Sequence, residues 1–395
     1  MLISIDESVI DFIRENKEEL NYCSKVIKSL NTIARAYADK EHFVIGDVYT
    51  LEYLCKCELL ENTSKRMFTS ISSQYVFIAG LQDRLNCKVV AHKKGNNFFK
   101  EGNEYWVPID RFEKLRESYL VSEDLSDCGF YESLCKKMMR GKRNFDGVNL
   151  KFFPDSCSGN QADRTVTSLL QRGHEAFILL IVDTDKDHHE SRPGPSFDEA
   201  LKVYKKTKTS NVIKLHEMKL REKENLVPPS LFLLIENPPH EEILRFLSEL
   251  EPYPEYENVL RYLDIKDGFK VGTYIGRGLY ENVIKGLETE NLLACSLTND
   301  NNKTIFNGIG NKVLENKFQK QVLEGGLLSI IKEKEKLLEE GKEIPRNVLV
   351  ELNYKYNKSK ELFASLPTYI EEDWHQLCED IVSWGCCPQN VKEVN

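Results

Sequence analysis

The sequence lacks both a long hydrophobic run and the layout of a secretion signal. Its apolar residues, 41% of the chain, never form the stretch of about 18 that a membrane-spanning helix needs. The first residues, Met-Leu-Ile-Ser-Ile-Asp-Glu-Ser, do not show the basic and then apolar order of a signal peptide. These absences argue against a membrane protein, and we expect a cytoplasmic protein with no membrane partner.

The 11 cysteines are not arranged as zinc ligands or as a disulfide framework. The chain has no Cys-x-x-Cys pair, and its two close pairs, Cys55 with Cys57 and Cys386 with Cys387, are too tight for a zinc site. We expect reduced thiols that pack as small apolar side chains. A Gly-x-x-x-x-Gly-Lys-Ser/Thr loop is also missing, which argues against a P-loop ATPase within this chain.

The net charge of −9 argues against a protein that coats nucleic acid without selectivity. Two segments are nevertheless basic: 134–151 has six Lys or Arg against one Asp, and 201–224 has eight against three Glu. Such segments can hold a polyanion on an acidic protein, although each could equally be a solvated helix face. The cations predicted to contact nucleic acid are Lys136, Lys137, Arg140, Lys142, Arg143, Lys205, Lys206 and Arg221.

The length of 395 residues and the changes in pattern along the chain predict three regions. We expect an α+β region over 1–115, an α/β domain over 116–238 and a mostly helical region over 239–395. Outside the central domain, the spacing of apolar residues predicts helices over 6–36, 63–85, 240–250, 313–340 and 346–364, a strand over 43–54 and a hairpin or loop over 94–104.

Strands and helices alternate in the central domain. The predicted strands cover 119–122, 150–154, 177–182 and 211–215, and the predicted helices cover 127–139, 161–172 and 197–206. Alternation at this spacing predicts a parallel sheet with right-handed connections and flanking helices. The unbroken apolar run at 177–182 is typical of a strand that is buried on both faces of such a sheet.

Acidic residues follow two of these strands. Asp183, Asp185 and Asp187 come directly after the strand over 177–182, and Glu123 with Asp127 follows the strand over 119–122. In a parallel sheet the carboxyl ends of both strands lie at the same edge, where open α/β sheets bind their ligands. Carboxylates gathered there would repel one another unless a cation lay between them. The pattern therefore predicts a site for one or two divalent cations, which prefer carboxylate oxygens.

These residues resemble the Toprim family, whose fold is shared by topoisomerases, bacterial primases and the overcoming-lysogenisation-defect (OLD) nucleases. Val121-Ser-Glu-Asp-Leu-Ser-Asp is similar to the OLD-type first motif, and the stretch from Phe177 to Asp185 resembles the Asp-x-Asp strand. Arg221-Glu-Lys-Glu-Asn-Leu-Val-Pro resembles a signature of antiphage Toprim nucleases, and Tyr262-Leu-Asp-Ile-Lys-Asp-Gly is a weaker match. The resemblance covers about 117–270. It departs from the family at Asp124, where a glycine is common.

The resemblance implies a Toprim-like parallel sheet and a metal-dependent nuclease, the effector of a bacterial antiphage system. The catalytic residues that it implies are Glu123, Asp183, Asp185 and Lys266. The implied ligands of Mg²⁺ or Mn²⁺ are Glu123, Asp127, Asp183, Asp185, Glu222 and Glu224. It further implies a DNA or RNA substrate and a separate ABC-type ATPase partner, with the flanking regions serving partner contacts or homo-oligomerisation.

Other functions remain open at this point. Asp183-Thr-Asp is also similar to the motif of haloacid-dehalogenase phosphatases, in which the first Asp is a nucleophile. An EF-hand fits poorly, because His188 stands where that loop requires glycine. A non-catalytic, nucleic-acid-binding regulatory subunit is the third alternative. Some of these acids could instead have purely structural roles. Glu222 could form a surface ion pair, Glu224 could cap a turn, and Asp187 could be a loop residue.

Overall fold

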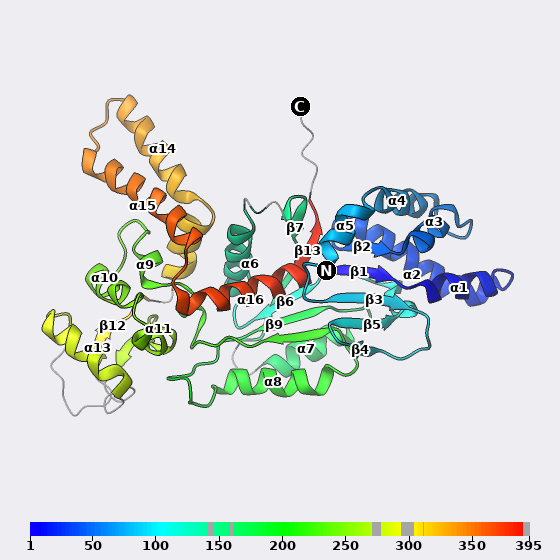
Figure 1. Cartoon of the computed structure of the whole chain (residues 1–395), viewed down its shortest axis with the longest axis horizontal. Helices are drawn as coiled ribbons and strands as arrows, with labels where there is room; N and C mark the ends of the chain where they lie inside the picture. Colours follow the sequence, from blue (N-terminus) through cyan, green and yellow to red (C-terminus); the bar gives the residue numbers. More distant parts are fainter. Residues whose placement is uncertain are drawn as a thin grey trace.

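The computed structural model describes residues 1–140, 142, 145–158, 161–270, 278–293, 304–310 and 312–389 (Figure 1). It is a mixed α/β structure in which helices flank a parallel sheet, as the sequence predicts. Arg143, one of the predicted nucleic-acid contacts, lies outside the described residues. No helix among those residues is long and apolar enough to span a membrane.

The N-terminal region is built on a sheet of order β2-β1-β3-β5-β4, in which only the edge strand β4 is antiparallel. Its strands are β1 (Leu2–Ile5), β2 (Phe43–Gly46), β3 (Lys88–His92), β4 (Phe99–Glu101) and β5 (Glu104–Pro108), and its helices are α1 (Glu7–Glu15), α2 (Leu20–Ala38), α3 (Val48–Lys56), α4 (Asn62–Ser73), α5 (Tyr75–Gln82) and the 3-10 helix η1 (Ile109–Glu113). The antiparallel pairing of β4 with β5 confirms the hairpin expected over 94–104.

Three predicted elements of this region are wrong in extent. The strand expected over 43–54 ends at Gly46, because the Asp47 side chain accepts a hydrogen bond from Thr50 N at 2.8 Å and starts α3. The helix expected over 6–36 is two helices, and the Asn16 side chain donates to Phe12 O at 2.8 Å where α1 ends. The helix expected over 63–85 is divided into α4 and α5 at Gln74.

The central sheet has the order β10-β9-β6-β8, and all of its strands are parallel. Its strands are β6 (Tyr119–Ser122), β8 (Phe153–Ser156), β9 (Ile178–Ile181) and β10 (Ile213–His216), and the helices around it are α6 (Leu125–Met139), α7 (Ala162–Gln171), α8 (Pro195–Thr207) and α16 (Thr368–Gly385). The chain runs from β6 to β8 and then returns past β6 to β9. The switch point of the sheet, where ligands bind in open α/β folds, therefore lies between β6 and β9.

The strand predicted over 150–154 is two strands that belong to different sheets. β7 (Val148–Leu150) pairs antiparallel with β13 (Cys386–Pro388), and β8 begins at Phe153. Directly after β7, Lys151 N donates to Gly385 O at 2.9 Å and extends the pairing of β7 with the segment around β13. A contact between segments so far apart in the sequence leaves no local pattern from which it could be predicted.

The β9 strand is buried on both faces, which explains its continuous apolar sequence. Ile178 and Leu180 belong to the core beneath α7 and α8, whereas Leu179 and Ile181 belong to the larger core on the opposite face. Figure 1 shows α7 and α8 below the sheet and α6 with α16 above it. Side chains on a strand alternate between faces, so both faces need apolar residues here.

The C-terminal region is mostly helical, as predicted, but its last helix returns to the central sheet and packs on α6, β7 and β9. The other elements are α9 (Pro229–Phe232), α10 (Glu241–Leu250), α11 (Glu257–Tyr262), α13 (Gly278–Thr289), α14 (Gly326–Glu339), α15 (Arg346–Ala364), the antiparallel pair β11 (Gly268–Lys270) and β12 (Thr304–Asn307), and the short helices η3 (Lys223–Leu226) and η4 (Pro254–Tyr256). The helix expected over 313–340 is divided into a π-helix, η5 (Leu314–Leu323), and α14. Gly325 separates the two with a φ of +86°.

Candidate metal centre

Three buried carboxylates meet at the carboxyl edge of the central sheet. Asp183 follows β9, and Glu222 and Glu224 lie on the segment between β10 and α9. One carboxylate oxygen from each residue lies within 4.8 Å of the others. We call this set the acid cluster. It contains the first acid of the predicted Asp-x-Asp strand and both acids of the Arg-Glu-Lys-Glu-Asn motif.

Backbone hydrogen bonds hold the Glu222–Glu224 segment against Asp183. Lys223 N donates to the Asp183 carboxylate at 3.0 Å. The Asn225 side chain donates to Leu260 O at 3.1 Å and to Leu263 O at 2.8 Å. The asparagine of the motif therefore fastens this segment to α11, and one oxygen of Asp183 is used to hold the segment in place.

Several oxygens of these acids are buried without a hydrogen-bond partner among the described residues. They are both carboxylate oxygens of Glu224, Oε1 of Glu222 and Oε1 of Glu123. A buried carboxylate oxygen without a partner is costly, because it loses its water and gains nothing in return. A hard divalent cation accepts such oxygens as ligands, so this donor set fits Mg²⁺ or Mn²⁺.

Burial and mutual repulsion raise the pKa values of these acids. Burial, followed by the charges of Glu224 and Glu123, raises the pKa of Asp183 well above its usual value. Burial and the neighbouring Glu222 raise the pKa of Glu224 to about 7. Burial and the charges of Asp185 and Asp127 do the same for Glu123, whose pKa is also about 7. Without a bound metal cation, the carboxyl groups of the site therefore tend to stay protonated, and a metal cation would replace these protons.

Glu123 and Asp185 stand at the border of the acid cluster. Glu123 ends β6 and is half-buried, whereas Asp185 is exposed and has a φ of +53°. Their oxygens are not among those that lie within 4.8 Å of one another. The Asp185 side chain packs directly against Gly194. A Cβ atom added at Gly194 would lie only 2.7 Å from the Asp185 carboxylate. Glycine at this position therefore allows the acidic loop to fold back on itself.

We predict that Gly194→Ala weakens Mn²⁺ binding about tenfold, because the added methyl group displaces the Asp185 carboxylate, whose negative charge acts on Glu123 at the border of the acid cluster. The fold should survive, since overpacking at a single position costs about 1–3 kcal/mol. Calorimetric titration of the full chain with Mn²⁺ measures the effect. Gly80→Ala is the matched control, because a Cβ atom at Gly80 meets nothing within 4 Å. Equal affinities in the two variants would contradict this role of Gly194.

Asp127 is engaged by other groups, although it was predicted as a metal ligand. One of its oxygens accepts from Asp124 N at 2.9 Å, and the other contacts the Lys223 ammonium. Asp124 forms the N-cap of α6 and completes a capping box with Asp127. The structure thus gives Asp127 a structural role at the start of α6, next to the acid cluster.

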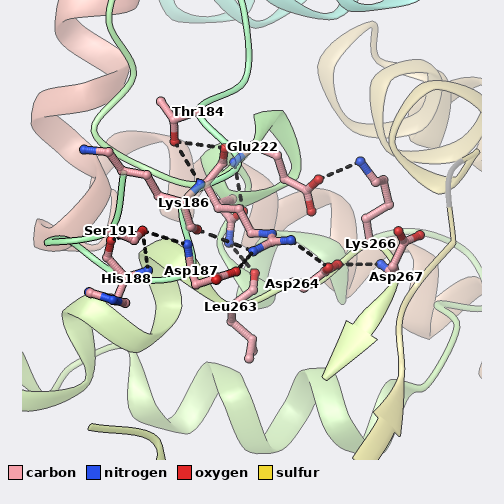
Figure 2. A network of polar contacts seen from close by, with 12 residues as sticks. Thr184, Lys186, Asp187, His188, Ser191, Glu222, Leu263, Asp264, Lys266 and Asp267 are labelled. Carbon is pink, nitrogen blue, oxygen red and sulfur yellow. Dashed lines mark hydrogen bonds and ion pairs between the residues drawn. The ribbon is translucent and has the colours of Figure 1, made fainter. Parts of the chain in front are cut away.

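Two lysines supply positive charge inside the site. Lys266 contacts Glu222 with an N–O distance of 2.6 Å, and Figure 2 shows its side chain reaching toward this carboxylate. Lys223 contacts Asp127 and also Glu315 of the π-helix, at 3.0 Å. Burial lowers the pKa of each lysine, but the adjacent carboxylates outweigh it, so both pKa values lie above normal. Both lysines therefore remain charged at neutral pH.

The sequence prediction included Lys266 but missed Lys223 and Glu315. Lys223 stands between the two acids of the Arg-Glu-Lys-Glu-Asn motif, and this position was the available signal. Glu315 gives no signal, because it lies 92 residues from Lys223 in a helical segment. Its Oε1 also accepts from Ser126 Oγ at 3.0 Å, so one glutamate connects the π-helix to α6 and to the site.

Arg221, predicted to contact nucleic acid, joins two loops of the site. Its guanidinium contacts Asp187 at 2.7 Å and Asp264 at 3.1 Å. Figure 2 shows Asp187 and Asp264 in this network, together with Ser191 and His188. Asp187 is thus held in an ion pair outside the acid cluster, and His188 accepts a hydrogen bond from Glu190 N at 3.2 Å.

The two basic segments lie on opposite faces of the sheet and do not form one surface (Figure 1). Lys205 and Lys206 are on α8, where Lys206 contacts Asp163 at 3.5 Å. Lys136 and Lys137 are on α6, with Arg140 and Lys142 just beyond its end, and Lys136 contacts Glu132. Contact of these cations with nucleic acid stays a prediction.

Comparisons of the chain with models of protein families, with curated proteins and with solved structures found no match. Function is therefore inferred from the chain's own residues and their arrangement.

Proposed function

We propose that this protein is a divalent-metal-dependent phosphodiester hydrolase of the Toprim type that acts on nucleic acid. The observation that carries the proposal is the acid cluster of Asp183, Glu222 and Glu224, in which three buried glutamate oxygens have no hydrogen-bond partner among the described residues. It lies at the carboxyl edge of β9, and Glu123 ends the neighbouring strand β6. Acids on the two strands that flank the switch point are the arrangement that the Toprim resemblance implies.

Asp183, Glu222 and Glu224 are the residues that would hold the cation. When bound, Mg²⁺ or Mn²⁺ supplies Lewis-acid stabilisation of phosphoryl oxygens and lowers the pKa of water. Glu123, whose pKa is about 7, can accept or release a proton at its carboxylate near neutral pH. It is half-buried at the border of the cluster, so it is the acid we assign to proton transfer.

The site lysines would contribute fixed positive charge. Lys266 lies 2.6 Å from Glu222 and stays protonated, so it can stabilise the negative charge that develops on the phosphoryl group. Lys223 neutralises Asp127 and holds the start of α6 against the acid cluster. We therefore assign a catalytic role to Lys266 and a positioning role to Lys223.

The biological setting of the proposal rests on the resemblance alone. The Arg221-Glu-Lys-Glu-Asn motif favours an effector of bacterial antiphage defence that works as a homo-oligomer with a separate ABC-type ATPase. The geometry supports this motif only in part: Glu222 and Glu224 face the site, and Asn225 anchors the segment to α11.

Incubation of the full chain with plasmid DNA, single-stranded DNA and tRNA tests the proposal. We expect cleavage of at least one of these in Mg²⁺ or Mn²⁺ and none in EDTA. A phosphomonoester such as p-nitrophenyl phosphate should not be hydrolysed. Turnover of the phosphomonoester alone would favour the Asp-x-Asp phosphatase, and binding of nucleic acid without cleavage in either metal would favour a regulatory subunit.

A further inference from the structure

A hollow of about 440 Å³ lies between the end of α6, the end of α15 and the start of α16. Its lining includes Lys137, Arg140, Lys142, Lys360, Phe363 and His375. We call it the cationic hollow. The helix α6 begins beside the acid cluster and has 15 residues, so its far end is about 22 Å away at 1.5 Å per residue. The hollow is therefore separate from the candidate metal centre.

The positive charge of the cationic hollow is not balanced. Within the part of the chain that the structure describes, none of its Lys and Arg side chains forms an ion pair with a carboxylate. The single acid in the lining, Glu371, lies 3.8 Å from His375. Neighbouring lysines outside the hollow are paired: Lys358 on α15 contacts Glu361 at 3.0 Å, and Lys136 on α6 contacts Glu132.

Lys137 shows the consequence of this imbalance. Its ammonium donates to Val322 O at 3.3 Å and lies 4.6 Å from the centre of the Phe363 ring, so it is held inside the hollow. Burial, and then the charges of Arg140 and Lys360, lower its pKa. Cations gathered in a partly desolvated site repel one another, and a bound anion would relieve that repulsion.

The lining also indicates what kind of anion would fit. One arginine and three lysines are among the lining residues, and guanidinium and ammonium groups are the usual partners of phosphate. Phe363, Met138 and Leu366 add an aromatic and apolar wall. Sites for small organic ligands are typically about 300–1,000 Å³ and combine apolar walls with a few charged groups. A nucleotide unit has both parts, a flat base and a charged phosphate.

We propose that the cationic hollow binds a phosphate-bearing ligand, either a nucleotide unit of a nucleic-acid strand or a free nucleoside phosphate. Lys137, Arg140 and Lys360 contact the phosphate. This proposal does not depend on hydrolysis at the acid cluster, because it concerns binding at a different place in the fold.

Calorimetric titration of the full chain without divalent cation tests the proposal. The probes are pyrophosphate, AMP, ATP and a short single-stranded oligonucleotide. We expect at least one of them to bind, and Arg140→Ala/Lys360→Ala to weaken that binding about tenfold or more, since a hydrogen bond to a charged group is worth about 1.5–3 kcal/mol. Both side chains are exposed, so the double variant should fold.

Lys358→Ala is the matched control, because Lys358 shares α15 with Lys360 but does not line the hollow. It should bind as tightly as the wild type. Binding of AMP or ATP would identify a free nucleotide as the source, binding of pyrophosphate would show that the phosphate groups suffice, and binding of the oligonucleotide alone would identify a strand. Absence of binding by every probe, or equal affinity in the wild type and the double variant, would overturn the proposal.

Discussion

We expect Asp183→Asn to lower metal-dependent hydrolysis about a thousandfold, comparable to the loss of a principal electrostatic group in other active sites. Asp183 supplies an oxygen to the acid cluster and is only 7% exposed, so water cannot easily replace it. In the wild type, Lys223 N donates a hydrogen bond to the Asp183 carboxylate at 3.0 Å. Asparagine has the same shape, and its side-chain oxygen can still accept this hydrogen bond. The change therefore removes the charge while it preserves the packing.

The measurement is the single-turnover rate in Mg²⁺ and in Mn²⁺ on whichever nucleic acid the wild type cleaves. Asp198→Asn is the matched control, since Asp198 is an exposed acid on α8 that does not belong to the acid cluster. It should retain the wild-type rate. Cleavage by Asp183→Asn at the wild-type rate, with unchanged metal dependence, would remove Asp183 from the mechanism.

We expect Glu224→Gln to stabilise the metal-free protein at pH 8. The pKa of Glu224 is raised to about 7 in the folded chain, from a usual value of 4.5. Its contribution to stability is fully present below pH 4.5 and is lost as the pH rises through 7, because the folded state then has to bury a negative charge. Glutamine carries no charge, so the variant should avoid a cost on the order of 3 kcal/mol.

Thermal unfolding in EDTA at pH 5 and pH 8 measures this effect. For a chain of 395 residues, the gain at pH 8 corresponds to about 4 °C in Tm. The second measurement adds Mg²⁺ at pH 8: it should raise the Tm of the wild type but have a smaller effect on the variant, which has lost a ligand.

Glu251→Gln is the matched control for the metal effect. Burial also raises the pKa of Glu251 to about 7, but its carboxylate accepts from Ser230 N at 2.7 Å and lies outside the acid cluster. This variant should keep the full response to Mg²⁺. If Glu224→Gln and Glu251→Gln respond to Mg²⁺ equally, Glu224 is not a ligand.

Elements with a strong local pattern were predicted well. The strand at Tyr119–Ser122 and the helix at Arg346–Ala364 have the predicted bounds, and the apolar run at 177–182 contains β9. Burial on one or two faces imposes a period on the sequence, and that period can be read without knowing what the faces contact. The strand expected over 43–54 was wrong because a side-chain cap at Asp47 outweighed the apolar pattern.

The acids of the candidate metal centre could be proposed from the sequence because they follow strands or stand in a short motif. Asp183, Glu222 and Glu224 do meet, because Lys223 N holds the motif against the acid that follows β9. Their surroundings could not be foreseen. Asp127 is occupied by Lys223, and Asp187 by Arg221, because each acid contacts whichever cation the packed chain brings nearest.

The sequence alone was sufficient to indicate a parallel α/β domain and an acidic strand end, since both depend on residues that are close along the chain. The pairing of charges was established by the packing of distant segments. Glu315 reaches the site from the π-helix, and Lys360 of α15 and Lys137 of α6 line the same hollow. Charge interactions act through space, so the fold decides which acidic oxygens stay available for a cation and which cations stay available for an anion.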